Sequence, residues 1–342
     1  MIDLMLLLFL VVCAIAAVSM KDLLSTTIIL GVYSLIMTVV WTRLNAVDVA
    51  FTEASVGAGI TTVLIIAALS RTKREEEGQE YGMWSKLLNP QDLKLTDKQS
   101  PLLWLTSLFI VLITGAVLIY GTIDMPDFGD PDAPANIHLA KRFIEESYEE
   151  TGVPNFVTAI LASYRGYDTL GETTVIFTAG ISLILLLRRK SYICDTTIKE
   201  KEMKEHIVIR TISRILIPFV QLYALYVIAH GELSPGGGFQ GGVIFGSSII
   251  LYVIAFGLEE GRKVRIFREM GDLLNSTGVL IYAGIGVLCL LAGGAYLEYD
   301  KLPLGSEKMA SSLGIYGIEI GVGITVAAVM ITIFFITARH ER

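Results

Sequence analysis

Charged residues, cysteine and histidine are all scarce in this sequence. Only 18% of its 342 residues are charged, whereas 53% are hydrophobic, and the mean hydropathy is +0.62. An average soluble domain has about 25% charged residues, so this composition excludes an ordinary soluble globular protein. We therefore expect a protein that resides in a lipid bilayer.

The few cysteines and histidines do not form a site by their spacing. No two cysteines have the Cys-x-x-Cys spacing of a metal or redox site, and the histidines lack metal-ligand spacing. These residues are Cys13, Cys194, Cys289, His138, His206, His230 and His340. We expect neither a metal nor a cofactor in this chain.

The net charge of −7 is spread over loops and does not indicate a nucleic-acid partner. The glycine-rich run 236–242 is also unlike a phosphate-binding loop, because it follows an apolar segment and has no Lys-Ser/Thr pair. The sequence therefore indicates neither nucleic-acid nor nucleotide binding.

Long apolar runs dominate the chain instead. Each is close to the length of about 20 residues with which a helix crosses a bilayer core. The first run has no basic leader or cleavage site, so we expect a retained helix and not a signal peptide. The runs are Ile2–Met20, Leu23–Thr42, Val47–Leu69, Leu102–Tyr120, Leu170–Leu187, Ile207–Ala229, Phe239–Leu258, Leu273–Leu297 and Gly314–Thr337. We predict an all-α polytopic membrane protein with about nine transmembrane helices.

Basic residues are distributed asymmetrically among the connections between these runs. If nine helices alternate, one side collects Lys21, Arg71, Lys73, Arg74, Lys86, Lys94, Lys98, Arg188, Arg189, Lys190, Arg262, Lys263, Arg265, Arg268, Arg339 and Arg342. The other side has only Arg43, Lys141, Arg142, Arg165, Lys301 and Lys308. Because lysine and arginine collect in cytoplasmic loops, the N-terminus is predicted outside and the C-terminus in the cytoplasm. We expect a multi-pass protein of the cytoplasmic membrane.

Two polar linkers divide the runs into three blocks. Residues 1–70 hold three predicted helices, residues 101–190 hold two, and residues 207–342 hold four. The linkers are residues 71–100 and 191–206, both predicted to be cytoplasmic. They resemble joints between pieces that could be separate chains.

The segment 121–169, inside the second block, is predicted to be partly structured on the outer side. Apolar residues at helical spacing predict an amphipathic helix from Asn136 and a second short helix after Pro154-Asn155. These residues are Ile137, Phe143, Ile144 and Tyr148, followed by Phe156, Ile160 and Tyr164. We expect both helices to lie on the membrane surface or against neighbouring subunits.

A glycine-rich motif, HGELSPGGGFQGG, occupies residues 230–242 between the sixth and seventh runs. Glycine permits positive φ and proline removes a backbone donor, so the motif cannot be continuous helix. Non-helical backbone at membrane depth is tolerated only where it is buried in protein or lines a water-filled cavity. We predict a structural turn that serves helix packing or ion access, with an ordinary extramembrane turn as the alternative. The turn residues are Ser234, Pro235, Gly236, Gly237, Gly238, Phe239, Gly241 and Gly242.

Two acidic residues lie in the first turns of the third apolar run. A charge inside a membrane helix is costly and by default indicates an ion or proton pathway. Asp48 lies near the helix start, and a helix cap close to the interface is the favoured interpretation for it. Glu53 lies roughly 9–10 Å below the helix start, and an ion pathway is favoured over a buried, hydrogen-bonded carboxylate.

Further candidates for the ion pathway occur in the second and third blocks. Asp168 and Glu172 would share a helix face with Arg165 and could hold a proton or cation. Residues 169–172 also match a capping box, in which Glu172 would only satisfy a helix start; the sequence leaves both open. Glu319 lies about five residues into the last run without capping geometry. His230 could relay protons or be an interfacial polar residue.

The three blocks together resemble a known family. HGELSPGGGFQGGVIFGSSIIL, YAGIGVLCLLAGGAYL and IEIGVGITVAAVMITIF resemble the B subunit of Mrp-type multisubunit sodium/proton antiporters. DVAFTEASVGAGITTVLIIAAL and VTAILASYRGYDTLGETTVIF resemble the D-type and E-type subunits of membrane-bound hydrogenases. The same two blocks form the C-terminal end of the large A-type antiporter chain. The resemblance covers the sequence apart from its linkers, but the antiporter-like domain that precedes these blocks in the A-type chain is missing.

The resemblance implies a non-catalytic membrane subunit of a complex that moves Na⁺ and H⁺. Its partners would be C-type, D-type antiporter-like and small E-, F- and G-type Mrp subunits, with a hydrogenase or sulfur-reductase redox arm as a further possibility. Glu53, Asp168, Glu172 and the turn 235–242 carry over as the expected functional residues. A structural scaffold without its own ion path is one alternative. A self-contained transporter is another, although the internal repeats expected of it are not evident.

Overall fold

The computed structural model describes residues 1–70, 72, 74, 101–187, 207–257 and 271–338. It divides into a larger unit, residues 1–77 with 146–342, and a smaller unit, residues 78–145. The predicted linkers 71–100 and 191–206 lie almost entirely outside the described residues, as does Leu258 at the end of the seventh run.

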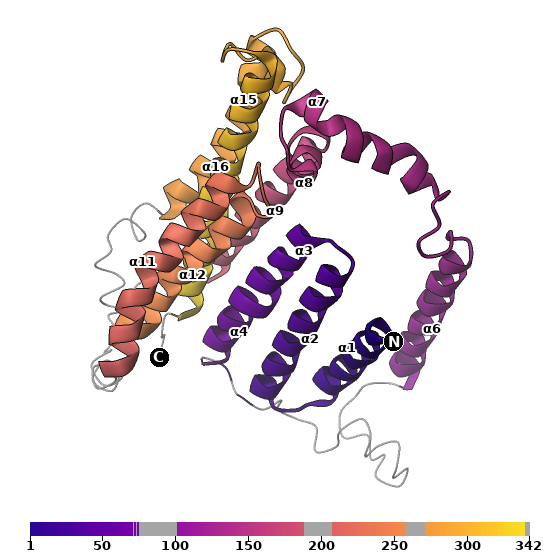
Figure 1. The fold of residues 1–342 in the computed structure, drawn as a ribbon. Helices are drawn as coiled ribbons and strands as arrows, with labels where there is room; N and C mark the ends of the chain where they lie inside the picture. Colours follow the sequence, from indigo (N-terminus) through magenta and orange to yellow (C-terminus); the bar gives the residue numbers. More distant parts are fainter. Residues whose placement is uncertain (71, 73, 75–100, 188–206, 258–270, 339–342) are drawn as a thin grey trace. The chain divides into compact units, whose positions relative to one another are not determined.

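The long helices correspond to the apolar runs (Figure 1). They are α1 (Ile2–Ser19), α2 (Leu23–Arg43), α3 to α4 (Val47–Leu69), α6 (Pro101–Ile123), α9 (Gly166–Leu187), α11 (Ile207–His230), α12 (Gly238–Phe256), α15 (Gly271–Leu291) and α16 (Glu307–Ala338). In the described part of the chain, nine helices are long and apolar enough to cross a membrane. This number confirms the prediction, whereas the orientation of the termini stays a prediction.

The third membrane helix is not a regular α-helix. It begins as α3 (Val47–Thr52), widens into the π-helix η1 (Glu53–Thr61) and ends as α4 (Thr62–Leu69). Glu53 is the first residue of the widened part. π-helical turns are rare and often occur at functional sites, and the hydrophobic pattern of the sequence gave no indication of this one.

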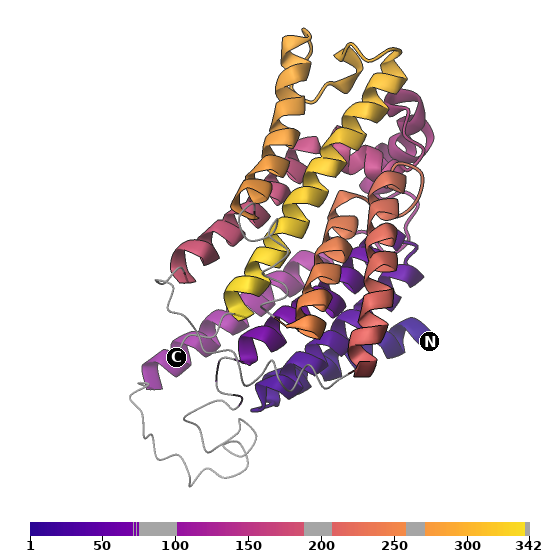
Figure 2. The ribbon, with the colours of Figure 1, turned by 90° about the vertical axis from the view of Figure 1, so that its left-hand side faces the viewer.

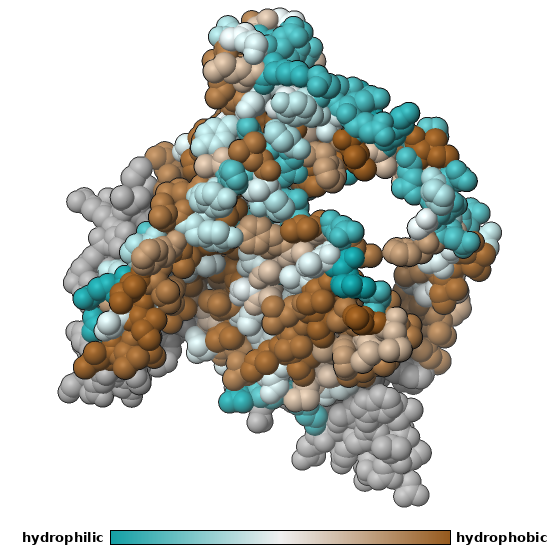
Figure 3. Space-filling model, viewed as in Figure 1, coloured by the Kyte–Doolittle hydropathy of each residue, from teal (hydrophilic) through white to brown (hydrophobic). Residues whose placement is uncertain are grey.

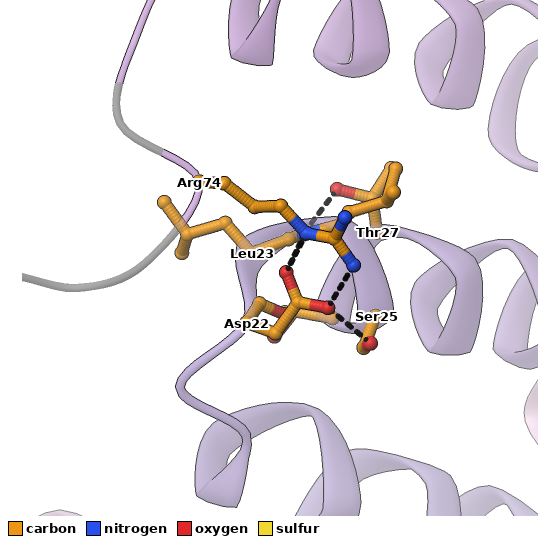
Figure 4. A network of polar contacts seen from close by, with 7 residues as sticks. Asp22, Leu23, Ser25, Thr27 and Arg74 are labelled. Atoms are coloured by element: carbon orange, nitrogen blue, oxygen red, sulfur yellow. Dashed lines mark hydrogen bonds and ion pairs between the residues drawn. The ribbon is translucent and has the colours of Figure 1, made fainter.

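The first block is closed by an arginine clamp, which Figure 4 shows. Asp22 caps α2 by accepting hydrogen bonds from the Leu24 amide at 3.3 Å and the Ser25 hydroxyl at 2.6 Å. The Arg74 guanidinium donates Nε–H and Nη2–H to the two carboxylate oxygens of Asp22, at 2.8 and 2.9 Å. This two-pronged contact holds the pKa of Asp22 far below its usual range. Arg74, which follows α4, is thereby bonded to the turn between α1 and α2.

The outer segment contains the predicted short helices. In the smaller unit, η3 (Ala135–Ala140) begins one residue before Asn136, the predicted start. It is followed by η4 (Arg142–Glu146), at the boundary of the two units, and in the larger unit by α7 (Ser147–Thr151), α8 (Phe156–Ala159) and η5 (Ile160–Tyr164). Asn155 caps α8 by accepting the Val157 amide at 3.0 Å. The second predicted helix is therefore present.

Helix α16 is the centre of the third block and packs on both α12 and α15 (Figures 1 and 2). Glycines permit these close approaches. A Cβ on Gly242 of α12 would lie 2.7 Å from the backbone oxygen of Gly323 on α16. A Cβ on Gly278 of α15 would overlap the backbone oxygen of Gly321 on α16. In lipid the hydrophobic effect does not drive helix association, so membrane helices associate through close van der Waals packing. Small residues allow that close packing.

Two predicted ends of the third block were wrong. Helix α15 stops at Leu291, not Leu297, because Gly293 has a positive φ of 90° and its amide bonds to the Leu290 carbonyl at 3.0 Å. Helix α16 starts at Glu307, not Gly314. The Ser306 hydroxyl accepts the Met309 amide at 3.3 Å and so caps a start that hydropathy alone does not indicate.

Apolar side chains remain exposed on many of these helices. Figure 3 shows hydrophobic residues over α2 and α11 and hydrophilic ones around α7. On α11, for example, Phe219 and Leu222 are 65% and 66% exposed. Such surfaces are unfavourable in water and suit lipid or neighbouring membrane subunits.

Candidate functional site at the glycine-rich turn

The glycine-rich motif breaks the chain between α11 and α12. Helix α11 ends at His230, and the amides of Leu233 and Ser234 both bond to its carbonyl at 3.0 Å. Gly236 has a φ of 130°, which a residue with a side chain rarely adopts. Helix α12 then starts at Gly238, so the turn is shorter than predicted. The expected turn residues that lie in the helix are Gly238, Phe239, Gly241 and Gly242.

Asp48 reaches this turn from the first block. Its Oδ1 accepts a hydrogen bond from the Gly236 amide at 2.9 Å. The cap residue of α3 is Ala46, which has no side-chain cap bond, so the interpretation of Asp48 as a helix cap was wrong. A second bond joins α3 to α12, because the Gln240 side-chain amide donates from Nε2 to the Thr52 hydroxyl at 2.7 Å. The first block is therefore fastened to the turn and to the start of α12.

Glu319 reaches the turn from α16. The amide of Gly238, the first residue of α12, donates to Glu319 Oε2. The first amides of a helix have no partner within it and carry a partial positive charge. Glu319 therefore caps a neighbouring helix, although it has no capping role in its own. It lies twelve residues after the start of α16, not five, because α16 begins earlier than predicted.

The second block holds the turn from its outer segment. Asn155 donates from its backbone amide to the Glu232 carbonyl at 2.9 Å. Its side chain donates to the carbonyls of Gly231 and Ser234, at 3.1 and 3.0 Å. The Thr158 hydroxyl adds a bond to the Gly231 carbonyl at 2.7 Å. Side chains of the first and second blocks and of α16 therefore meet at one turn of seven residues, 231–237.

Glu232 is an acidic residue of the turn itself. Its Oε2 accepts a hydrogen bond from the Ser312 hydroxyl of α16 at 2.7 Å, whereas its Oε1 is buried without a partner. Burial raises the pKa of this carboxyl group above its ordinary value, and the Ser312 bond opposes that shift in part. The sequence interpretation did not single out Glu232. Its position inside the motif, between His230 and Pro235, was the available signal.

Among the contacts of the described residues, Glu53 does not contact the glycine-rich turn, but lies between η1 and α2. Its side chain is half-buried and lies over Gly57 of η1. A Cβ at Gly57 would lie 2.5 Å from Glu53 Oε1 and 2.6 Å from the Ser34 hydroxyl of α2. Gly57 therefore makes room for the carboxylate between η1 and α2. Glu53 is thus separate from the contacts that join Asp48 and Glu319 to the turn.

Asp168 and Glu172 are not brought to the turn either. Asp168 pairs with Arg165 at 2.6 Å, with both side chains more than half exposed. Helix α9 begins at Gly166, so residues 169–172 lie within it and the capping-box interpretation of Glu172 was wrong. Glu172 is exposed on α9. The prediction that these carboxylates take part in an ion pathway stays a prediction.

His230 contributes its backbone to the turn and its ring to α11. The imidazole lies against Tyr226, with ring centroids 4.9 Å apart. Among the described residues, no group of three or more histidine, cysteine or acidic side chains is arranged to hold a metal ion. The turn thus brings together carboxylates whose oxygens accept backbone amides.

The helices and the turn define a multi-pass membrane protein built from three helical blocks. Three family models match the chain in succession, and together they match most of its length. The MbhD family of membrane-bound hydrogenase (MBH) subunits matches residues 8–74, and the MbhE family of the same complex matches residues 112–204. The domain related to the MnhB subunit of Na⁺/H⁺ antiporters matches residues 208–332. The chain belongs to these families, as a fusion of an MbhD, an MbhE and an MnhB-related domain.

A longer protein is similar to most of this chain. A "Probable K(+)/H(+) antiporter" chain of the A/B type, from Rhizobium meliloti, is 27% identical over 87% of this chain. The present chain spans 31% of the length of that relative. It is therefore similar to about a third of a larger protein.

Two solved membrane complexes have chains of similar fold. A chain of the Mrp complex from Dietzia sp. DQ12-45-1b superposes with a TM-score of 0.67 at 24% identity, covering 96% of this chain and 34% of the other. A chain of the membrane-bound sulfane sulfur reductase, an archaeal respiratory membrane complex, gives a TM-score of 0.52 at 27% identity. That match covers 70% of this chain and all of the other.

Proposed function

We propose that this chain is a membrane subunit of a multisubunit Mrp-type complex that translocates cations and protons. The observation that carries this proposal is the meeting of two carboxylates at the turn 231–237 and the start of α12, where Asp48 accepts the Gly236 amide and Glu319 accepts the Gly238 amide. Carboxylates inside a membrane are costly, and by default they indicate an ion or proton pathway. The MnhB-type match over the same turn and α16 supports the assignment.

The chain itself has no catalytic site in this proposal. Electron transfer, where the complex includes it, belongs to a partner such as a hydrogenase or sulfur-reductase arm. The sulfane sulfur reductase neighbour supports that possibility. The other partners are Mrp-type C, antiporter-like D, and small E, F and G subunits, and the ions are Na⁺ and H⁺. The complex resides in the cytoplasmic membrane.

A scaffold without an ion path is the second candidate, and one observation favours it. Asn155 and Gln240 use neutral hydrogen bonds to join the blocks at the turn, as a structural joint would. The two candidates differ in what neutralising a carboxylate does. A scaffold tolerates the change once it is assembled, whereas an ion path does not.

Glu53 provides that test. Glu53→Gln keeps the size of the side chain and its place between η1 and α2, but it cannot exchange a proton or carry charge. We expect the complex to assemble while Na⁺-dependent proton movement in inverted vesicles falls, and Glu53→Asp to retain part of the rate. Glu307→Gln, in the exposed first turn of α16, is the matched control. Wild-type transport by an assembled Glu53→Gln complex at every pH would favour the scaffold.

A further inference from the structure

The three acidic side chains at the turn differ in what surrounds their oxygens. Asp48 and Glu319 each accept a backbone amide, from Gly236 and Gly238. Glu232 receives no backbone amide among the contacts of the described residues, but only the hydroxyl of Ser312 at 2.7 Å.

The second oxygen of Glu232 has no donor. Its Oε1 is one of three buried side-chain atoms without a hydrogen-bond partner among the described residues. Burying an ionised carboxylate costs free energy when one of its oxygens has no hydrogen-bond donor. A protonated carboxyl group is neutral and can itself donate a hydrogen bond. The environment of Glu232 therefore favours the protonated form, in agreement with the raised pKa that burial gives it.

The position of Glu232 connects it to Glu319. Its partner Ser312 and Glu319 lie seven residues apart on α16, which places them on one helix face about 10 Å apart along the axis. Glu232 therefore lies beside the same face of α16, two helical turns nearer Glu307 than Glu319 is. Asp48 on α3 bonds to the turn, and His230 at the end of α11 adjoins it. One helical turn before Ser312 on α16, Lys308 pairs with Glu149 of α7 at 2.8 Å.

We propose that Glu232 is a proton-binding residue of the ion path, and that it binds and releases one proton on Oε1 during transport. No other bond changes in this step: a proton moves from water or a hydrated neighbour to the carboxylate and back. Asp48 and Glu319, which the proposed function places in the same ion path, also hold the turn and the start of α12 by accepting backbone amides. The proposal assigns a proton site within the ion-translocating function proposed above, and it rests on that function.

Infrared difference spectroscopy of the assembled complex tests the bound proton directly. The wild-type complex is expected to show, at pH values above the ordinary range of a glutamate, the carbonyl stretch of a protonated carboxylic acid, and Glu232→Gln should lose the part of that band that Glu232 contributes. Ser312→Ala removes a donor that favours the ionised form, so the band should persist to higher pH than in the wild type. An identical protonated-acid band in the wild type and in Glu232→Gln would overturn the proposal.

Transport by the same variants tests the exchange. Glu232→Gln is expected to lower Na⁺-dependent proton movement by roughly tenfold or more, and Glu232→Asp to restore part of it. If Glu232→Gln transports at the wild-type rate while Glu319→Gln and Glu53→Gln do not, this inference fails and the proposed function stands. If none of the three variants lowers transport, the proposed function fails as well, even where the infrared band is present.

Stability measured against pH is a third readout, independent of transport. The folded state raises the pKa of Glu232, so this group contributes stability at low pH that is lost as the pH rises through its folded pKa. We expect the unfolding temperature of the complex to fall less in Glu232→Gln than in the wild type as pH rises above the ordinary range of a glutamate. An equal fall in both proteins would contradict the assignment.

Discussion

Gly238→Ala is expected to prevent stable assembly of the third block. The added Cβ would overlap the backbone oxygen of Glu319 and would lie 2.9 Å from its Oε2. Neither helix can yield easily, because Gly242 also lies against the backbone of Gly323 on the same interface. Such overpacking costs about 3 kcal/mol where the backbone has to move. The change should also displace the amide that Glu319 accepts.

The amount of intact complex after mild solubilisation measures this effect. Gly284→Ala is the matched control, because it is a helical glycine of α15 whose Cβ would meet nothing within 4 Å. We expect the control to assemble like the wild type and Gly238→Ala to be recovered as aggregate or degraded chain. Normal recovery of Gly238→Ala would show that α12 and α16 do not pack at this distance.

Glu319→Gln is expected to have the largest effect on transport with the complex intact. Glutamine keeps an oxygen that can accept the Gly238 amide, so the cap on α12 is retained. It loses the charge and the exchangeable proton. Transport of Na⁺ and H⁺ should therefore fall to the leak rate of vesicles without the complex, at every pH.

Two further variants distinguish the effect of losing the Glu319 carboxylate from the effect of losing the hydrogen bond that caps α12. Glu319→Ala removes both and should also lower the amount of complex, whereas Glu319→Gln should lower only transport. Thr52→Val, which removes a neutral bond to Gln240 near the same turn, should leave transport close to the wild-type rate once the complex is assembled. Active Glu319→Gln complex would make this carboxylate a structural cap alone.

The membrane helices were predictable because each helix satisfies its own backbone hydrogen bonds. Length and hydropathy are therefore enough to identify it. The runs at 2–20 and 23–42 agree with α1 and α2 within one residue at each end. The start of α16 was not predictable in this way. Polar residues such as Ser306 and Glu307 begin that helix through capping and not through hydropathy.

The candidate site was predictable only in its parts. The motif at 230–242 and the acids Asp48 and Glu319 were identified from residue types in apolar surroundings. Their meeting was not, because Asp48 and Gly236 are 188 residues apart and nothing local in the sequence connects them. The same separation explains why Asp48 was interpreted as a cap, since a cap requires only neighbours in sequence.

Glu232, Asn155 and the π-helix were missed for related reasons. Glu232 is one acidic residue in a polar turn. That its Oε1 is buried without a hydrogen-bond partner becomes evident only in the folded turn. Asn155 was recognised as a helix start, but its bonds to Gly231 and Ser234 depend on tertiary structure. The widening at Glu53 does not change the apolar character of its run, so hydropathy does not report it.

One measurement tests most directly whether this chain moves ions as part of a larger complex. The purified chain and the intact complex that contains it are placed separately in proteoliposomes, and Na⁺-dependent proton movement is followed in both. We predict rapid exchange by the complex, none above leak by the chain alone, and loss of the exchange when the complex carries Glu319→Gln. Substantial exchange by the chain alone, or wild-type exchange by the Glu319→Gln complex, would contradict the account.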